Sequence, residues 1–207
     1  KSYAQFLRDE FFKPLGMKHS RYPTEYFPDG SFARKFSDGK VLPQEFVNTF
    51  GSGGLYSTPT DLCHFLAMLA SEGWFEGQQI LSRSAVAAMG TDQVSGTFRV
   101  LESQKLRYGL GWDSVAQPGL RAVGKTAWVK GGDTLYYGSC ILVVPGEGLG
   151  AAVIGVGGIG SSDAEKLCER MLMAALVDRG RLAAIPAPLP QTPLAEAAVD
   201  RDYLDLV

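Results

Sequence analysis

Residues 130–139 carry the combination of side chains and backbone that is best suited to chemistry in this chain. The segment reads Lys130-Gly131-Gly132-Asp133-Thr134-Leu135-Tyr136-Tyr137-Gly138-Ser139. Glycines inside a strand cost stability unless something must approach the backbone closely. We therefore predict that a substrate lies against this edge and accepts hydrogen bonds from its backbone N–H groups. From these residues alone, a glycine-rich β-turn with an exposed lysine is an equally good explanation.

Residues 155–160 spell GxGxxG, which in a βαβ unit holds the pyrophosphate of a dinucleotide. A strand pattern precedes the motif and a helix pattern follows it. After the helix comes only a proline-rich segment, so no second strand closes the unit and no acidic residue is placed for the ribose. We interpret the glycines as a strand-to-helix connection. A nucleotide-binding oxidoreductase stays an alternative that cofactor titration tests.

Ser37 and Lys40 form the only SxxK of the chain. This spacing is catalytic when the two side chains lie one helical turn apart, because the amine can then take the hydroxyl proton. Here the intervening Asp38-Gly39 favours a turn inside a loop, which indicates a chance match. No GxSxG occurs in the sequence.

Composition excludes several classes of protein. The chain has 207 residues, 45% of them hydrophobic, and a formal net charge of −2, which fits a globular domain and leaves no basic cluster for nucleic acid. The apolar run at 149–159 is too short and too rich in glycine to span a bilayer. We expect no metal site, because neither a disulfide framework nor a metal-ligand spacing arises from Cys63, Cys140, Cys168, His19 and His64. We also expect no cofactor.

The first half of the chain predicts helices that are joined by a long loop. Apolar residues from Tyr3 onward recur at helical spacing until Pro14 ends the pattern. Residues 18–50 show no sustained period and predict an ordered loop that carries function or covers something. Thr58 is a good N-cap for the next helix, and a further short helix is predicted over Arg83–Met89.

The second half changes to strand patterns from about residue 108. Strands are predicted over 108–112, 126–130, 135–144 and 149–156, and a helix over 163–177. These elements predict an α+β fold with an antiparallel sheet of about three strands between 108 and 156, packed by the C-terminal helix, beside a helical and loop subdomain. The predicted parts are the helical and loop subdomain at 1–105, the strands and helix at 106–180, and a proline-rich linker and tail at 181–207.

Several segments match one family in order and spacing. They are Phe12-Lys13-Pro14-Leu15-Gly16-Met17, Gly53-Gly54-Leu55-Tyr56-Ser57-Thr58-Pro59-Thr60-Asp61-Leu62, Tyr108-Gly109-Leu110-Gly111-Trp112, Lys130-Gly131-Gly132 and Tyr137-Gly138-Ser139. Across about residues 1–178 the chain resembles the serine β-lactamase and penicillin-binding-protein superfamily, in particular its class C-like branch of esterases, D-aminopeptidases and DD-peptidases. The resemblance implies part of a β-lactamase/transpeptidase-like fold.

The resemblance also implies chemistry through an acyl-enzyme, in which a serine of SxxK attacks the acyl carbon. In that superfamily the N–H after the third motif is one of two oxyanion donors, and here it would be the N–H of Asp133. Lys130 matches the motif's Lys or His, which tunes proton transfer and binds a substrate carboxylate. Gly131 replaces the usual Thr and so removes a hydroxyl that holds an acidic substrate group. The expected substrate-binding residues are Gly131, Gly132, Thr134 and Tyr137.

No helix-borne SxxK and no YxN occurs in these residues. The chain therefore resembles the C-terminal part of a β-lactamase, DD-peptidase or esterase, and we expect it to be inactive alone. The alternative is a non-catalytic binding or regulatory module with the same fold. An upstream SxxK followed by YxN would decide for the enzyme.

Partners and location follow from the same resemblance. The substrate is a small molecule or a peptide, with peptide, ester and β-lactam all open, and Tyr22, Tyr26 and Phe27 of the loop at 18–50 are placed to shape its pocket. The family pairs its first strands with its last, which would leave 149–156 as an apolar edge for an N-terminal fragment or a second copy. The resemblance implies an extracytoplasmic location.

Overall fold

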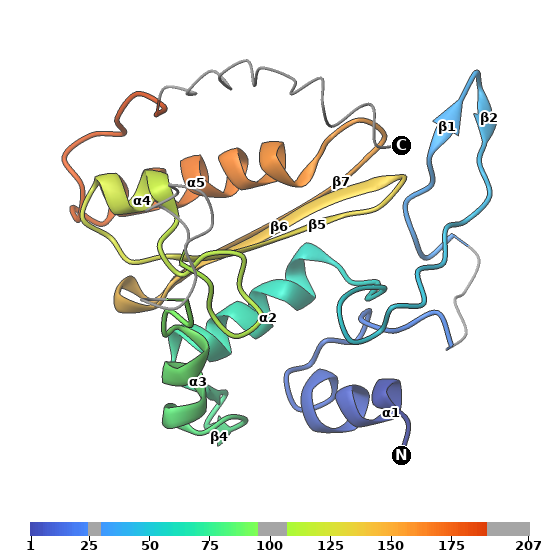
Figure 1. Cartoon of the computed structure of the whole chain (residues 1–207), viewed down its shortest axis with the longest axis horizontal. Helices are drawn as coiled ribbons and strands as arrows, with labels where there is room; N and C mark the ends of the chain where they lie inside the picture. Colours follow the sequence, from blue (N-terminus) through green and yellow to red (C-terminus); the bar gives the residue numbers. More distant parts are fainter. Residues whose placement is uncertain (25–29, 95–106, 190–207) are drawn as a thin grey trace, which may run out of the picture.

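The computed structural model describes residues 1–24, 30–94 and 107–189, and it confirms the predicted α+β fold. Its centre is an antiparallel sheet of β5 (Trp128–Asp133), β6 (Tyr137–Val144) and β7 (Leu149–Val156), with β6 in the middle. Helix α5 (Ser161–Asp178) covers one face of the sheet, and helix α2 (Pro59–Ala70) covers the other (Figure 1). The sheet therefore separates two buried layers.

Both layers are built from alternate residues of the same strands. On β6, Cys140 and Leu142 pack toward α5, whereas Val143 packs toward α2. The α5 side also buries Leu172 and Leu176 of the helix. Because helices cover both faces, the central strand is a nearly continuous apolar run instead of an alternating one.

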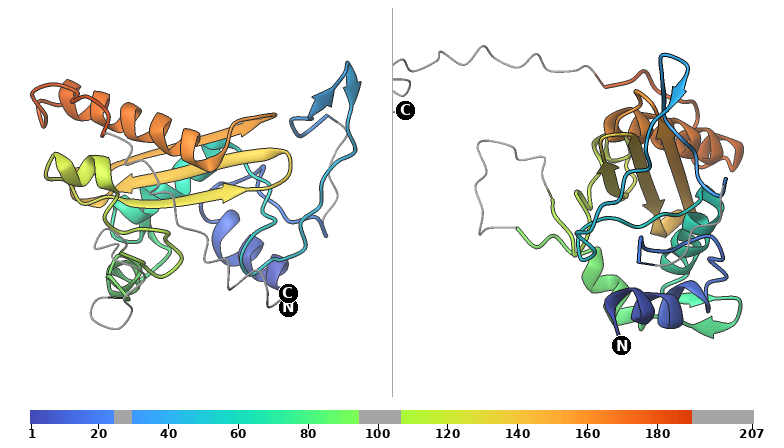
Figure 2. Two further views of the ribbon diagram at one scale, coloured as in Figure 1. Left: turned by 45° about the horizontal axis from the view of Figure 1, so that its top comes forward. Right: turned by 90° about the vertical axis from the view of Figure 1, so that its right-hand side faces the viewer.

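The other described elements are short. They are α1 (Tyr3–Leu7), the π-helical turn η1 (Arg8–Phe12), the hairpin strands β1 (Phe36–Ser37) and β2 (Lys40–Val41), the hairpin strands β3 (Trp74–Phe75) and β4 (Gln78–Gln79), α3 (Arg83–Met89), α4 (Pro118–Ala122) and the 3-10 turn η2 (Pro145–Glu147). The Thr58 hydroxyl caps α2 by accepting the Asp61 N–H at 3.2 Å. Figure 2 shows the β1–β2 hairpin standing away from the sheet.

Two strand predictions need correction. Residues 108–112 form no strand, because the chain turns back at Gly111 (φ +79°) and makes only an isolated bridge. The strand predicted over 126–130 begins at Trp128 and continues to Asp133. The paired glycines therefore lie inside β5, and the β-turn alternative for them is wrong.

The SxxK at 37–40 and the GxGxxG at 155–160 both lie in connections between elements. Asp38 (φ 49°) and Gly39 (φ 74°) turn the β1–β2 hairpin, so the SxxK pair is not on a helix. The glycines at 155–160 join β7 to α5, and within the part of the chain that the structure describes no strand follows α5. A βαβ unit is therefore not formed at this point.

The long loop and the predicted subdomain boundary are only partly described. Residues 18–24 and 30–50 are irregular apart from the β1–β2 hairpin and one isolated bridge. Tyr26, Phe27 and most of the predicted tail lie outside the described residues. One buried cluster contains both Leu66 and Trp128, from the two sides of the boundary predicted at 105. The division into subdomains stays a prediction.

The packing of α5 predicts very different effects for two of its leucines. Leu172 is 2% exposed in the layer against the sheet, whereas Leu167 is 49% exposed on the same helix. We expect Leu172→Ala to lower the free energy of unfolding by about 2–5 kcal/mol, because it removes buried methyl groups and leaves a cavity. Leu167→Ala should change it by no more than about 0.5 kcal/mol. Urea unfolding followed by circular dichroism measures both, and equal losses would contradict this packing.

Candidate functional site

The pairing of β5 with β6 determines which backbone groups of β5 face the open edge of the sheet. Thr134 N–H donates to the Tyr137 carbonyl at 2.8 Å, so these two residues are a hydrogen-bonded pair of the ladder. Because such pairs alternate along antiparallel strands, the backbone groups of Val129, Gly131 and Asp133 point away from β6. These three residues therefore present their N–H and C=O groups at the edge of the sheet.

Residues 113–114 cover the first part of that edge. Val129 exchanges backbone hydrogen bonds with Asp113 and Ser114 at 2.8–3.3 Å. The next outward N–H, that of Gly131, donates to Oδ2 of Asp113 at 2.7 Å. The N–H of Asp133 is then the next outward donor, and among the described residues no hydrogen bond engages it.

Lys130 brings its ammonium group to the same edge. Its Nζ lies 3.1 Å from Oδ1 and 3.2 Å from Oδ2 of Asp113, and it donates to the Gly131 carbonyl at 2.5 Å. The Lys130 and Asp113 side chains are 41% and 52% exposed, so this is an ion pair at the surface. A positive charge therefore stands beside the outward donors of β5.

The Asp133 carboxylate leaves the face of the sheet toward α5, whereas the N–H of the same residue lies in the plane of the sheet and points to its edge. Its Oδ1 accepts the Ser161 N–H at 2.7 Å, and its Oδ2 accepts the Ser161 hydroxyl. Gly160, the N-cap of α5, has no side chain that could do this. Asp133 therefore caps α5 from the sheet, and a carboxylate is favourable there because the helix N-terminus is positive.

The glycines of β5 are explained by close contacts within the chain. A Cβ atom on Gly131 would lie 3.0 Å from Cβ of Ser161, and one on Gly132 would lie 2.8 Å from the Ser139 hydroxyl oxygen. The expectation that something approaches this backbone closely is thus met, but by α5 and by β6. The glycines by themselves are no evidence of a substrate.

Thr134 and Tyr137 shape the end of the hairpin between β5 and β6. The Thr134 hydroxyl accepts the N–H groups of Tyr136 at 3.3 Å and Tyr137 at 3.1 Å, so it holds the turn. The Tyr137 hydroxyl donates to the Ala33 carbonyl at 2.5 Å, and its ring meets that of Tyr56 edge-on with centroids 6.2 Å apart. Burial raises the pKa of both tyrosines, which keeps their hydroxyls neutral.

The loop before α2 adds further aromatic rings beside the β5–β6 hairpin. The rings of Phe32 and Tyr56 lie edge-on at 6.3 Å. Oε1 of Glu45 accepts the Leu135 N–H at 3.0 Å, and the Glu45 carbonyl accepts the Tyr56 hydroxyl. Arg34 stacks over the Phe32 ring, with 4.9 Å to the ring centroid. Parts of the 18–50 loop therefore contact the β5–β6 hairpin, through Ala33 at Tyr137 and Glu45 at Leu135.

Sequence reasoning missed two residues that organise this site, Asp113 and Ser161. Asp113 directly follows the Tyr108–Trp112 motif, and Ser161 is the first residue of α5. Their positions beside recognised segments were available signals, but their contacts with Gly131 and Asp133 cross 18 and 28 residues of sequence. No sequence pattern predicts a contact between residues so far apart in the chain.

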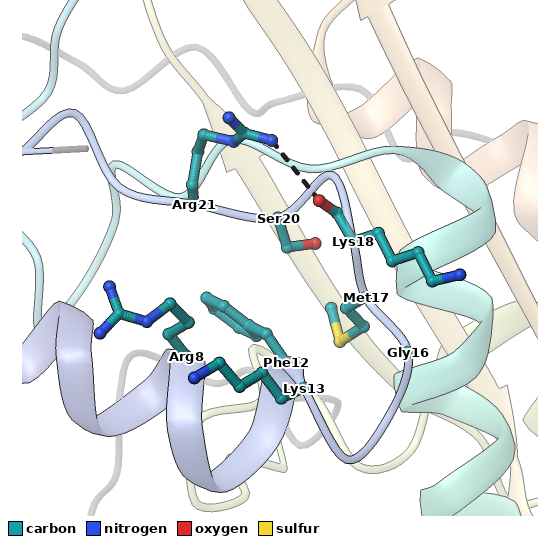
Figure 3. Close-up of a pocket in the computed structure, with 8 residues that line it drawn as sticks. All are labelled: Arg8, Phe12, Lys13, Gly16, Met17, Lys18, Ser20 and Arg21. Atoms are coloured by element: carbon teal, nitrogen blue, oxygen red, sulfur yellow. Dashed lines mark hydrogen bonds between the residues drawn. The ribbon is translucent and has the colours of Figure 1, made fainter. Parts of the chain in front are cut away.

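A separate cavity of about 470 Å³ lies at the end of the N-terminal helix (Figure 3). It is lined by Arg8, Phe12, Lys13, Gly16, Met17, Lys18, Ser20 and Arg21. None of the predicted site residues borders it. Asp9 already pairs with Lys13 at 2.9 Å, and Arg21 donates to the Lys18 carbonyl at 3.4 Å.

Within residues 1–24, 30–94 and 107–189, His, Cys, Asp and Glu side chains form no group of three or more that could hold a metal ion. No described helix combines the length and the apolar character that crossing a membrane needs.

Comparison with known proteins gives consistent matches. The family model described as Beta-lactamase matches residues 1–165. The chain is similar to the D-alanyl-D-alanine-carboxypeptidase/endopeptidase AmpH of Escherichia coli K12, with 26% identity over 162 residues that cover 74% of this chain and 39% of AmpH. The AmpH of Escherichia coli O157:H7 matches equally. The chain thus spans about two fifths of the length of these relatives.

Solved structures resemble the fold. One is the octameric penicillin-binding protein homologue from Pyrococcus abyssi, with a TM-score of 0.62, 21% identity, and coverage of 84% of this chain and 38% of that one. Another is a putative β-lactamase from Bacteroides dorei, with a TM-score of 0.51, 22% identity, and coverage of 82% and 52%. At these identities the likeness concerns the fold alone.

The contact between Asp133 and Ser161 predicts a shared effect on stability. Asp133→Ala should lower the free energy of unfolding by about 1 kcal/mol, since it removes the cap of α5. Ser161→Ala should cost less, because the Ser161 N–H keeps its acceptor, and the double variant should lose less than the sum of the two. Denaturant unfolding measures all three. Ser162→Ala, at the next and exposed position of α5, is the control, and additive losses would contradict the contact.

Proposed function

Because this chain belongs to the Beta-lactamase family, a family of serine hydrolases, we propose that it is the C-terminal part of a hydrolase that works through an acyl-enzyme. The observation that carries the proposal is the outward N–H of Asp133 at the edge of β5, with the Lys130 ammonium beside it. An acyl oxygen that lies against this edge would accept the Asp133 N–H. The second oxyanion donor would be the backbone N–H of the nucleophilic serine.

The arrangement suits a developing negative charge. The Asp133 N–H is fixed by the β5–β6 ladder on one side and by the contact of its own carboxylate with α5 on the other. A donor that is held in place before reaction costs no reorganisation, and removing one such donor typically costs ~2.7–4 kcal/mol of transition-state stabilisation. Lys130 would take part in proton transfer at the same place.

The nucleophile is proposed to lie outside these residues. The SxxK at Ser37–Lys40 sits in a hairpin turn, and no other SxxK exists in the sequence. The chain covers 39% of AmpH, which leaves room in a relative of that length for an upstream serine. A serine hydrolase of this design needs both parts to assemble its site.

The chain alone is therefore expected to show no turnover. Removing a nucleophile commonly costs about 10⁶ in kcat. We expect no hydrolysis of p-nitrophenyl butyrate or nitrocefin above background by residues 1–207, and clear hydrolysis of at least one of them by a longer protein with an upstream SxxK. Turnover by the chain alone would contradict the proposal.

Within the longer protein, Lys130→Gln should lower kcat by about 10²-fold, the lower range for a group that assists proton transfer. Lys166→Gln is the matched control, since Lys166 is an exposed lysine of α5 that pairs with Asp163 at 3.2 Å. Equal rates for the two variants would remove Lys130 from the mechanism.

We also propose that the free edge of β7 pairs with an N-terminal fragment or with a second copy of the chain. Strand β7 is an outer strand of the sheet, and its even-numbered residues point their backbone groups away from β6. Such an edge is a ready template for another strand.

This proposal predicts association of the isolated chain. Light scattering should show a mass above that of the monomer that rises with concentration. Ile154→Pro should weaken the association, because it removes an outward N–H while it leaves the ladder to β6 intact. A monomer at every concentration would count against the proposal.

A further inference from the structure

The charge of Lys130 is already compensated before any substrate arrives. Both carboxylate oxygens of Asp113 lie within 3.2 Å of its Nζ, and a third contact goes to the Gly131 carbonyl at 2.5 Å. An ammonium group has three donors. These contacts therefore occupy the group that would otherwise attract an anion to this edge.

Asp113 is not free to move away from that position. Its backbone N–H donates to the Val129 carbonyl at 3.0 Å, and its Oδ2 accepts the Gly131 N–H at 2.7 Å. A carboxylate that left Lys130 would also leave the Gly131 N–H without its acceptor. The negative charge is therefore built into the edge of β5.

The balance of side-chain charges beside Lys130 is unfavourable for a substrate carboxylate. The charged side chains in contact with β5 here, within the described ranges, are one cation, Lys130, and two carboxylates, Asp113 and Asp133. The Asp133 carboxylate is partly compensated by the N-terminus of α5. A substrate carboxylate beside Lys130 would lie close to Asp113 and be repelled by it. Gly131 adds no hydroxyl that could hold the carboxylate instead.

We infer that Asp113 determines specificity and makes this site select uncharged acyl substrates, such as neutral esters, over substrates with a carboxylate near the reacting bond. This inference rests on the proposed hydrolase function and narrows its substrate class. Asp113 acts through Lys130, whose ammonium it holds and neutralises. Asp113→Asn keeps one oxygen acceptor for the Gly131 N–H and removes the negative charge. Its amide NH2 also replaces the second oxygen beside the Lys130 ammonium, so the variant both removes the charge and loosens the contact with Lys130.

The experiment compares two esters with the same leaving group in the longer protein. They are p-nitrophenyl butyrate, which is uncharged, and mono-p-nitrophenyl glutarate, which carries a carboxylate. The unsubstituted protein should prefer the butyrate in kcat/KM. Asp113→Asn should raise the glutarate-to-butyrate ratio about tenfold, which corresponds to ~1.4 kcal/mol. Added salt should narrow the preference of the unsubstituted protein, because it screens exposed charges.

Glu72→Gln is the matched control, since Glu72 is 57% exposed and pairs with Arg83 far along the chain from this edge. It should leave the ratio unchanged. An unchanged ratio in Asp113→Asn, or a preference of the unsubstituted protein for the glutarate, would overturn the inference.

A binding measurement on the chain itself separates this inference from the proposed function. Benzoate and benzamide are titrated while the amide signals of Gly131, Gly132 and Asp133 are followed by NMR. Benzoate should bind about tenfold more tightly to Asp113→Asn than to the unsubstituted chain, with no such gain for benzamide. Equal benzoate binding, or none to either protein, overturns the role of Asp113. Absence of ester hydrolysis by the longer protein would overturn the proposed function alone.

Discussion

The pairing of β5 with β6 is the constraint on which the rest of this site depends. In an antiparallel ladder, consecutive residues direct their backbone groups alternately toward the partner and away from it. The Thr134–Tyr137 pair sets that phase, and it turns the Asp133 N–H toward the open edge. A slip of one residue would turn this N–H into the ladder and exchange the faces of Lys130 and Asp133. The proposed chemistry therefore depends on register as much as on residue type.

Helix α5 secures that strand from one face and shapes it at the same time. The Asp133 carboxylate holds Ser161 at the start of the helix, and a Cβ atom at position 131 would lie only 3.0 Å from Cβ of Ser161. The backbone N–H of Asp133 faces the edge, while its side chain caps α5 and so stabilises the fold. Stability and the geometry of the proposed oxyanion donor are thus linked through one residue.

Local signals predicted those elements that local interactions stabilise. Helix α3 occupies Arg83–Met89 as expected, because Ser82 caps it and Gly90 follows it. Strand β7 occupies Leu149–Val156 as expected, since a continuous apolar run lies between glycine-rich connections. The same reasoning failed at 108–112, where alternating residues looked like a strand but Gly111 at φ +79° reverses the chain. There, a backbone conformation that glycine permits overrode the side-chain pattern.

The α+β class, the family resemblance and the importance of segment 130–139 are all legible in the order of the residues. These features are carried by periodicity and by motifs whose residues are neighbours in the chain. The folded chain was needed to show which N–H of β5 faces outward. It also shows that α5 and β6 lie close to the glycines and that Asp113 neutralises Lys130. Those facts depend on strand phase and on contacts between residues of separate elements, which only the packed sheet and helix bring together.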